Sequence, residues 1–203
     1  MNVMRRVLIL FAHPALRRSR VNRRLIEAVR GLDGVVVNDL YEEYPEFDID
    51  VGREQRLLEQ HDVVVFQHPF YWYSSPSILK EWQDLVLEHG WAYGRDGRAL
   101  EGKLLLSAIT TGGGEEAYRR EGSNRFTVRE LLAPIEQTAR LCRMVYLPPF
   151  VVHGTHRLAG PDIDRYAKDY RRALEALRDG RLDLTAVSRL PRLNADLDAV
   201  IGG

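Results

Sequence analysis

The sequence of 203 residues contains a single cysteine, Cys142, so the chain cannot form an internal disulfide bond. The lack of disulfides is typical of reducing compartments, and we predict a cytoplasmic protein. Cys142 lies in an apolar stretch, residues 141–147, where a thiol is usually buried and unreactive. We therefore interpret the cysteine as a core residue and not as a nucleophile.

Long hydrophobic runs are also missing. The apolar run nearest the N-terminus, VLILFA at residues 7–12, has six residues. A secretory signal needs an apolar core of about 7–15 residues, and a membrane-spanning helix needs about 20. The sequence therefore predicts neither a signal peptide nor a membrane span.

An excess of charge of either sign is absent, because 29 basic residues balance 29 acidic ones. Binding to a nucleic-acid backbone relies on many cations, so we expect no nucleic-acid partner. Hydrophobic residues make up 45% of the chain, which excludes wholesale disorder. A chain of this length can bury the core of one domain.

Two kinds of hydrophobic pattern alternate along the chain. Short apolar runs without strict alternation are typical of strands covered on both faces, and they occur at residues 7–12, 35–37, 63–67, 104–109 and 144–147. Apolar residues at helical spacing occur at residues 21–29, 54–60, 77–87, 127–141 and 163–177. Strands separated by helices require parallel crossovers. We therefore predict an α/β fold, a flavodoxin-like doubly wound five-stranded parallel sheet with helices on both faces.

The predicted domain covers residues 1–180. The remaining residues, 181–203, show turn signals but no clear period. We expect this C-terminal tail to form an extended arm or to contact a partner.

Ligands of open α/β sheets bind beyond the carboxyl ends of the strands, so chemistry is expected in the turns after the first, third and fourth strands. The first turn contains neither GxGxxG nor GxxxxGK[ST]. A dinucleotide-binding Rossmann site and a P-loop NTPase therefore both lose their main support.

The first turn, residues 13–22, combines hydrogen-bond donors with positive charge at the start of a helix. His13, Ser19 and Asn22 supply donors, and arginines at positions 17, 18 and 20 raise the local potential. Free amides at a helix start can hold a phosphate when such side chains reinforce them. The alternative is that Ser19 only caps the helix and that the arginines form a solvated rim.

The third turn places four aromatic residues in a row, Phe70, Tyr71, Trp72 and Tyr73. Loops run over the surface, and a contiguous exposed aromatic patch usually marks a binding site. Flat apolar rings with polar tips suit a planar heteroaromatic ligand. A dimer interface or a hydrophobic plug is the alternative.

The fourth turn begins with Thr110 and Thr111 and continues with glycines at positions 112–114. Glycines directly after a strand let the main chain approach a ligand closely with its amides, although they can equally form a flexible turn. Together the three turns provide a phosphate cradle, an aromatic shelf and an amide-rich loop at one edge of the sheet. A phosphorylated flat cofactor, meaning a flavin nucleotide, fits all three.

Five motifs in fixed order resemble those of one known family. They are AHP with SxxN (residues 12–22), QHPFYWYSxPxxLKxW (67–82), HGWAYG (89–94), TTGGGE (110–115) and LPPF (147–150). The sequence thus resembles the flavodoxin-like NAD(P)H:quinone oxidoreductases. Within them it is most similar to the bacterial oxidoreductases that accompany glutathione-regulated potassium-efflux systems.

The resemblance implies an enzyme that reduces quinones with NADH or NADPH by a ping-pong route, as a homodimer with sites at the subunit interface. FMN is favoured over the FAD of eukaryotic relatives, because nothing obvious here serves an adenosine half. The residues implied to hold the FMN phosphate are His13, Ser19, Arg20, Val21 and Asn22. Those implied to line the isoalloxazine are Phe70, Tyr71, Trp72 and Tyr73. The residues implied to form hydrogen bonds with the pyrimidine edge of the isoalloxazine are Thr110, Thr111, Gly112 and Gly113.

Two residues after the glycine turn are implied to be catalytic, Tyr118 and Asn124. The quinone reductases place a tyrosine and then a histidine here, and Asn124 stands where the histidine is expected. Asparagine can donate a hydrogen bond but cannot titrate near neutrality, so we expect no proton relay through this position. No metal site is predicted, because His153 and His156 lack further ligands at suitable spacing.

Two other functions stand as alternatives. The resemblance also allows a regulatory subunit that docks on a potassium-efflux transporter at the inner face of the membrane. The second alternative is a one-electron carrier of the flavodoxin type. Such carriers are typically acidic beside the cofactor, whereas this chain is neutral and has an arginine-rich first turn.

Overall fold

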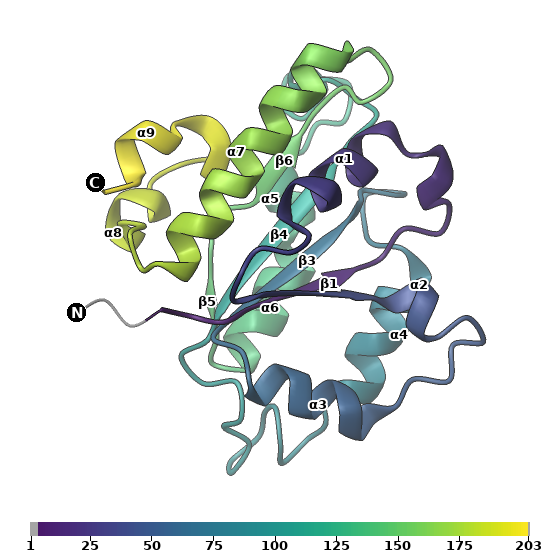
Figure 1. Ribbon diagram of the computed structural model, residues 1–203, viewed down its shortest axis with the longest axis vertical. Coiled ribbons are helices and arrows are strands. Elements are labelled where there is room, and N and C mark those ends of the chain that lie inside the picture. The colour runs from purple at the N-terminus through teal and green to yellow at the C-terminus, as the bar shows by residue number, and fades with distance from the viewer. Residues whose placement is uncertain (1–3, 203) are drawn as a thin grey trace.

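The computed structural model describes residues 4–202, and a parallel sheet forms its centre (Figure 1). The strands are β1 (Val7–Phe11), β2 (Val35–Asp39), β3 (Val63–Pro69), β4 (Leu104–Thr110), β5 (Val145–Tyr146) and β6 (Phe150–Val152). Their order is β2-β1-β3-β4-β5, and β6 also pairs with β4. Every pairing is parallel, which confirms the predicted doubly wound sheet.

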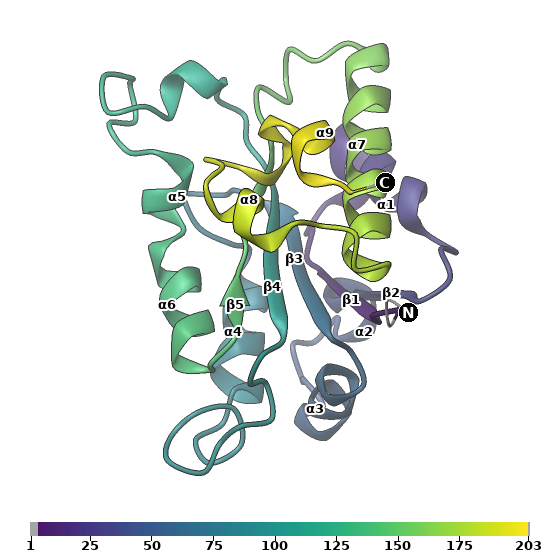
Figure 2. The ribbon, with the colours of Figure 1, turned by 90° about the vertical axis from the view of Figure 1, so that its left-hand side faces the viewer.

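Helices cover both faces of the sheet, as predicted (Figure 2). One face carries α1 (Arg20–Val29) and α7 (Gly160–Arg178), and the other carries α2 (Leu40–Glu43), α3 (Val51–Glu59), α4 (Ser77–Val86), α5 (Val128–Leu131) and α6 (Ala133–Leu141). Along β1, Ile9 faces the α1 and α7 side while Leu8 and Leu10 face the other. Both sets are fully buried, which explains why the strands do not alternate with polar residues.

The predicted fifth strand is followed by a sixth strand that the sequence did not predict. β5 pairs with the start of β4, and β6 pairs with its end, from Ala108 to Thr110. Pro148 and Pro149 lie between the two strands, and proline has no N–H to donate to a ladder. The strand predicted at residues 144–147 is therefore confirmed as β5, whereas β6, which ends at Val152, was not predicted.

The helix predicted at residues 127–141 is also divided. Thr127 and Glu130 form a capping box at the start of α5, and α6 begins again at Ala133. Pro134 lies in the first turn of α6, where its missing N–H costs nothing, whereas one continuous helix would need that N–H.

The C-terminal residues are not an extended arm, and that expectation is wrong. They form α8 (Leu184–Ser188), a short 3₁₀ helix η3 (Leu193–Ala195) and α9 (Leu197–Val200) beside α7 (Figure 1). Their buried apolar side chains join the core on the α1 and α7 face, namely Leu182, Val187, Leu193, Leu197 and Val200. We call residues 181–202 the C-terminal segment.

The C-terminal segment is bonded to the outer edge of β6. Asn194 accepts a hydrogen bond from the Val151 N–H (3.0 Å) and donates one to the Val151 carbonyl (2.9 Å). The Leu193 N–H donates to the Pro149 carbonyl (2.8 Å). These bonds satisfy backbone groups that an edge strand would otherwise leave open.

A buried carboxylate ties three elements together on the opposite face. The Glu54 side chain in α3 is fully buried. It accepts hydrogen bonds from the Tyr44 hydroxyl (2.7 Å), the Trp82 Nε1 (2.8 Å) and the Asn38 Nδ2 (2.9 Å), and it pairs with the Arg53 guanidinium. A buried charge is tolerated only when it is paired and hydrogen-bonded in this way.

Within residues 4–202, none of the helices combines the length and the apolar composition needed to cross a membrane.

Candidate functional site

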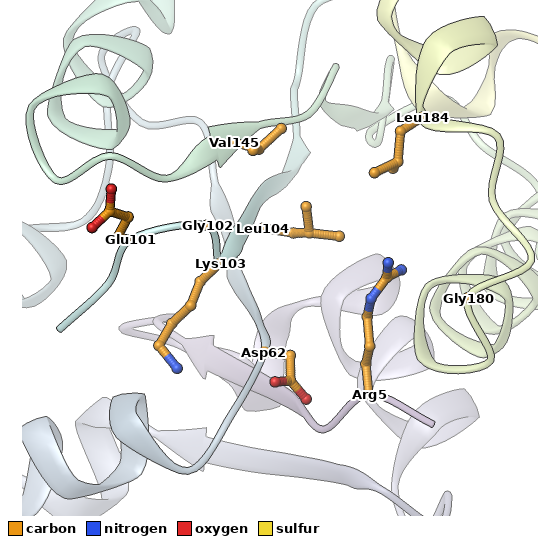
Figure 3. Close-up of a pocket in the computed structure, with 9 residues that line it drawn as sticks. All are labelled: Arg5, Asp62, Glu101, Gly102, Lys103, Leu104, Val145, Gly180 and Leu184. Carbon is orange, nitrogen blue, oxygen red and sulfur yellow. The ribbon is translucent and has the colours of Figure 1, made fainter. Parts of the chain in front are cut away.

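Two cavities of about 620 Å³ lie at opposite ends of the sheet. The one at the amino ends is shown in Figure 3, and its lining includes Arg5, Asp62 and Lys103. Their polar groups are already used within the protein: Lys103 Nζ donates to the His61 carbonyl (2.7 Å), and Asp62 accepts from the Arg6 N–H (2.8 Å). This cavity therefore offers few convergent groups to a ligand.

The other cavity lies at the carboxyl ends of the strands, and we call it the loop cavity. Nine of the predicted cofactor residues line it, namely His13, Ser19, Arg20, Val21, Asn22, Phe70, Tyr71, Thr110 and Gly112. The predicted residues Trp72, Tyr73, Thr111 and Gly113 do not. The structure thus brings the three turns together at one edge.

Five further residues line the loop cavity: Arg18, whose charge was predicted to favour a phosphate, and Ala15, Pro69, Thr155 and His156, which were not predicted. Thr155 and His156 follow β6, so they reach the carboxyl edge of the sheet together with the other turns. Sequence reasoning missed them because it predicted no strand between residue 147 and these two residues, where β6 lies. The signal that could have found them is the apolar run directly after Pro149.

The first turn ends at the N-terminus of α1, which points into the loop cavity. Ser19 is the N-cap, and its hydroxyl accepts a hydrogen bond from the Asn22 N–H (3.1 Å). The capping interpretation is therefore correct, and the same residue also lines the cavity. The first N–H groups of a helix have no partner within it, and Arg18 and Arg20 add positive charge beside them. This end of the loop cavity suits an anion.

His13 is buried at the same end of the loop cavity. Its Nδ1 accepts a hydrogen bond from the Ala15 N–H (3.1 Å). Burial lowers the pKa of the His13 ring, so the ring is neutral and its proton is on Nε2. His13 thus offers one N–H donor and no charge.

Asn22 and Thr110 form the floor between the first and fourth turns. Asn22 Nδ2 donates to the Thr110 hydroxyl oxygen (2.9 Å). Within residues 4–202, the buried Asn22 Oδ1 has no hydrogen-bond partner. A buried polar atom without a partner costs free energy, so this oxygen is an acceptor available to a bound molecule.

The aromatic turn has an unusual backbone. Trp72 and Tyr73 have φ values of 50° and 61°, and the Ser74 N–H donates to the Tyr71 carbonyl (2.9 Å). This is the geometry of a tight hairpin turn, for which glycine or asparagine is usual. Left-handed backbone at large side chains costs on the order of 1–3 kcal/mol per residue and tends to occur at functional sites.

Because of this backbone conformation, two of the four aromatic side chains line the loop cavity and two do not. Phe70 is buried, and Tyr71 is half exposed; both line the loop cavity. Trp72 is 91% exposed, and Tyr73 points away from the loop cavity toward residue 124. The row of aromatics therefore provides one inward wall and one outward surface.

The glycine turn is in close contact with two side chains, which would have to shift to admit a larger residue. A Cβ at Gly112 would lie 2.9 Å from His156 Nε2, and one at Gly113 would lie 3.2 Å from the Tyr118 ring. Thr111 is turned inward: its N–H donates to the Val152 carbonyl (2.9 Å) and its hydroxyl to the Gly113 carbonyl (2.8 Å). The N–H of Thr111 is therefore unavailable to a ligand.

Tyr118 and Asn124 lie just beyond the loop cavity. The Tyr118 ring packs on Phe70 and on His153, with ring centres 6.3 and 5.6 Å apart. Burial raises the pKa of the Tyr118 hydroxyl, which keeps it protonated at neutral pH. Asn124 Oδ1 accepts a hydrogen bond from the Tyr73 hydroxyl (3.2 Å).

His153 is the histidine that stands beside Tyr118, and sequence reasoning considered it only as a metal ligand. Its Nδ1 lies 3.2 Å from the Thr111 hydroxyl oxygen. Burial lowers the pKa of His153 to about 4, so the ring is neutral at physiological pH. In the part of the chain that the structure describes, no group of three imidazole, thiol or carboxylate side chains is placed to hold a metal ion.

Comparison with known proteins identifies the family. The family model described as "Flavodoxin-like fold" matches residues 5–177. The glutathione-regulated potassium-efflux system ancillary protein KefG of Pectobacterium carotovorum subsp. carotovorum is 47% identical over 81% of this chain and 90% of its own.

Two solved structures share both the fold and much of the sequence. General stress protein 14 from Treponema denticola, solved in complex with FMN, is 42% identical, with a TM-score of 0.82 over 85% of this chain and 99% of its own. An NADPH-quinone reductase from P. pentosaceus is 34% identical, with a TM-score of 0.76 over 83% of this chain and 96% of its own. The resemblance inferred from the motifs is confirmed, and the chain belongs to the flavodoxin-like fold family.

Proposed function

We propose that this protein is an FMN-dependent NAD(P)H oxidoreductase that reduces quinones or similar electrophilic acceptors. The observation that carries this proposal is the loop cavity, which joins an anion-binding helix start to an aromatic wall. The FMN in the structure that is 42% identical and the NADPH-quinone reductase that is 34% identical support the same conclusion.

The phosphate end of FMN fits the groups at the start of α1. We assign His13, Ser19, Arg20, Val21 and Asn22 to the phosphate, and Arg18 to the same anion-binding end. A neutral imidazole N–H, free helix amides and guanidinium groups are all donors to a phosphate. The unpartnered Asn22 Oδ1 suits a hydroxyl of the ribityl chain, because that hydroxyl is a donor.

The ring end of FMN fits the other half of the loop cavity. We assign Phe70 and Tyr71 to the isoalloxazine face, and Thr110 and Gly112 to its polar edge. The N–H group of Gly112 can stabilise negative charge at that edge, as preorganised dipoles do. Trp72, Tyr73 and Thr111 are not assigned to direct contact, since each points elsewhere.

Bound FMN would supply the hydride-transfer chemistry between NADH or NADPH and the acceptor. Tyr118 is proposed to donate a hydrogen bond from its protonated hydroxyl to the reacting groups. Asn124 is proposed to hold Tyr73 and to supply an amide donor, without carrying a proton.

We further propose that two copies of the chain assemble through the outward aromatic surface. Trp72, Tyr73 and Phe126 are each about half exposed or more, and Asn124 links the two loops that carry them. Exposed aromatic residues of this kind are typical of protein interfaces. The mass of the purified protein in sedimentation velocity tests this assembly.

A role as ancillary subunit of a potassium-efflux transporter is the second candidate, and it rests on the names of relatives such as KefG. It does not compete with the reductase activity, because a docked subunit can also carry out redox chemistry.

The function is tested by the absorption spectrum of the purified protein under argon. We expect a yellow protein in the presence of FMN, bleaching by one equivalent of NADH or NADPH, and return of the colour when a quinone is added. Failure to bind FMN would contradict the proposal. A bound flavin that neither nicotinamide reduces would favour the carrier alternative.

The phosphate assignment predicts that Ser19→Ala combined with Asn22→Ala weakens FMN binding by about 10-fold to 100-fold. The Ser19 hydrogen bond to the charged phosphate is worth about 1.5–3 kcal/mol, the Asn22 hydrogen bond to a neutral hydroxyl about 0.5–1.5 kcal/mol, and water recovers part of both. Quenching of FMN fluorescence on binding measures the affinity.

The matched control for that double variant is Asp50→Ala, which removes the N-cap of α3 far from the loop cavity. It should lose a similar amount of helix-cap stability, about 1 kcal/mol, but keep its FMN affinity. If the double variant binds FMN as tightly as the control does, the phosphate lies elsewhere.

A further inference from the structure

A third cavity, of about 360 Å³, lies beside Tyr118, and we call it the Tyr118 cavity. It is lined by Glu115, Tyr118, Arg119, Thr127, Val128, Arg129, Val151, His153, Pro191 and Arg192. Its volume is within the usual range for small-molecule sites, about 300–1,000 Å³. None of the functions assigned above uses it.

The inner surface of the Tyr118 cavity is apolar. Val128 and Val151 are buried, and the rings of Tyr118 and Pro191 complete the surface. His153 is neutral because burial lowers its pKa, so it adds no charge. Such a surface suits the flat body of an aromatic molecule.

The rim of the Tyr118 cavity is positively charged. Arg119, Arg129 and Arg192 face a single lining carboxylate, Glu115. Arg192 pairs with Glu115 (2.7 Å), and Arg129 pairs with Glu136 from outside the cavity (3.5 Å). After both pairs are counted, the positive charge of Arg119 is left over, and Arg129 shares the Glu136 carboxylate with Arg140 (2.7 Å). Guanidinium groups favour carboxylate, sulfonate or phosphate oxygens.

The C-terminal segment builds one wall of this cavity. Pro191 and Arg192 belong to it, and the adjacent Asn194 fixes the segment to β6 through both backbone groups of Val151. The match to the flavodoxin-like family model ends at residue 177, so this wall lies outside the matched region. The ion pair between Arg192 and Glu115 connects the C-terminal segment to the residue that directly follows the glycine turn.

We propose that the Tyr118 cavity binds a small aromatic anion, with its ring on Val128, Val151 and Tyr118 and its anionic group at Arg119 and Arg129. The site is separate from the loop cavity and does not depend on the proposed flavin chemistry. Tyr118 lines this cavity and is also one of the candidate catalytic residues, so an occupant would contact the Tyr118 side chain.

Isothermal titration calorimetry with naphthalene-1-sulfonate tests this site, on the full-length protein with and without saturating FMN. Naphthalene-1-methanol is the matched neutral probe, because it keeps the ring and lacks the charge. We expect one sulfonate per chain in both states, and binding of the alcohol at least about tenfold weaker.

Arg119→Gln removes the proposed anion contact from an exposed side chain and should not disturb folding. It should weaken sulfonate binding about tenfold and leave the alcohol unchanged. The control is Arg189→Gln, an exposed arginine of the same C-terminal segment that does not line the cavity, and it should change neither. Displacement of the sulfonate by FMN, or equal effects of the two variants, would overturn the proposal.

Discussion

Replacing Glu54 with alanine is expected to lower the free energy of unfolding by about 3–5 kcal/mol. The substitution removes the shared acceptor of Tyr44, Trp82 and Asn38 and leaves the Arg53 guanidinium without its buried partner. Donors that lose their acceptor inside the protein retain the full cost of leaving water. Urea unfolding followed by Trp fluorescence and circular dichroism measures the change.

The matched control for Glu54 is Glu27→Ala on α1. Glu27 also pairs with arginines, Arg23 and Arg24, but its side chain is half exposed. Exposed ion pairs contribute about 0–1 kcal/mol, so this variant should stay close to the parent protein. Equal stability of the two variants would mean that the buried carboxylate is not the link between β2, α3 and α4.

Lowering the pH is expected to reduce the free energy of unfolding already above the pH range in which carboxylates are protonated. The residue responsible is His68. This side chain is fully buried at the end of β3. Its Nδ1 donates to the Pro69 carbonyl (2.9 Å), and among the described residues Nε2 has no partner. Desolvation by burial lowers the pKa of His68 to about 4, from about 6.5 in the unfolded chain.

The direction of the pH effect follows from proton binding. Between pH 6.5 and 4 the unfolded chain binds a proton at His68 and the folded chain does not, so stability is complete above pH 6.5 and falls as the pH drops toward 4. The loss amounts to about 3 kcal/mol for this shift. Burial also lowers the pKa of His153, which acts in the same direction.

Urea unfolding at pH 7.5, 5.5 and 4.5 measures the slope, and His68→Gln should flatten it because the amide does not titrate. His89→Gln, at an exposed position, is the control and should keep the parent slope. An unchanged slope in His68→Gln would assign the acid sensitivity to other groups.

Much of the fold could be predicted because the information is local. Each buried strand is a short apolar run, and the turn that follows it carries its own recognisable residues, such as Ser19 before α1 or Gly112 after β4. Parallel topology then places those turns at one edge. Nine predicted residues therefore line one cavity.

The features that were missed depend on contacts between distant parts of the chain. Glu54 lies in an amphipathic helix where a glutamate is usually solvent-exposed, and only its partners in other elements reveal that it is buried. The helices of the C-terminal segment have four or five residues, too few to show a helical period. His153 was considered only as a metal ligand, because the strand that carries it to the site, β6, comes after two prolines and was not predicted.

The bonds between Asn194 and β6 bear on where this protein can be shortened. A fragment that contained only the region matched by the family model would end at residue 177. It would lack Leu193 and Val200, which belong to the hydrophobic core. It would also expose the backbone groups of the edge strand β6, which could then pair with another chain. The end of the family match is therefore not a suitable truncation site for this chain, because side chains of the C-terminal segment form part of its core.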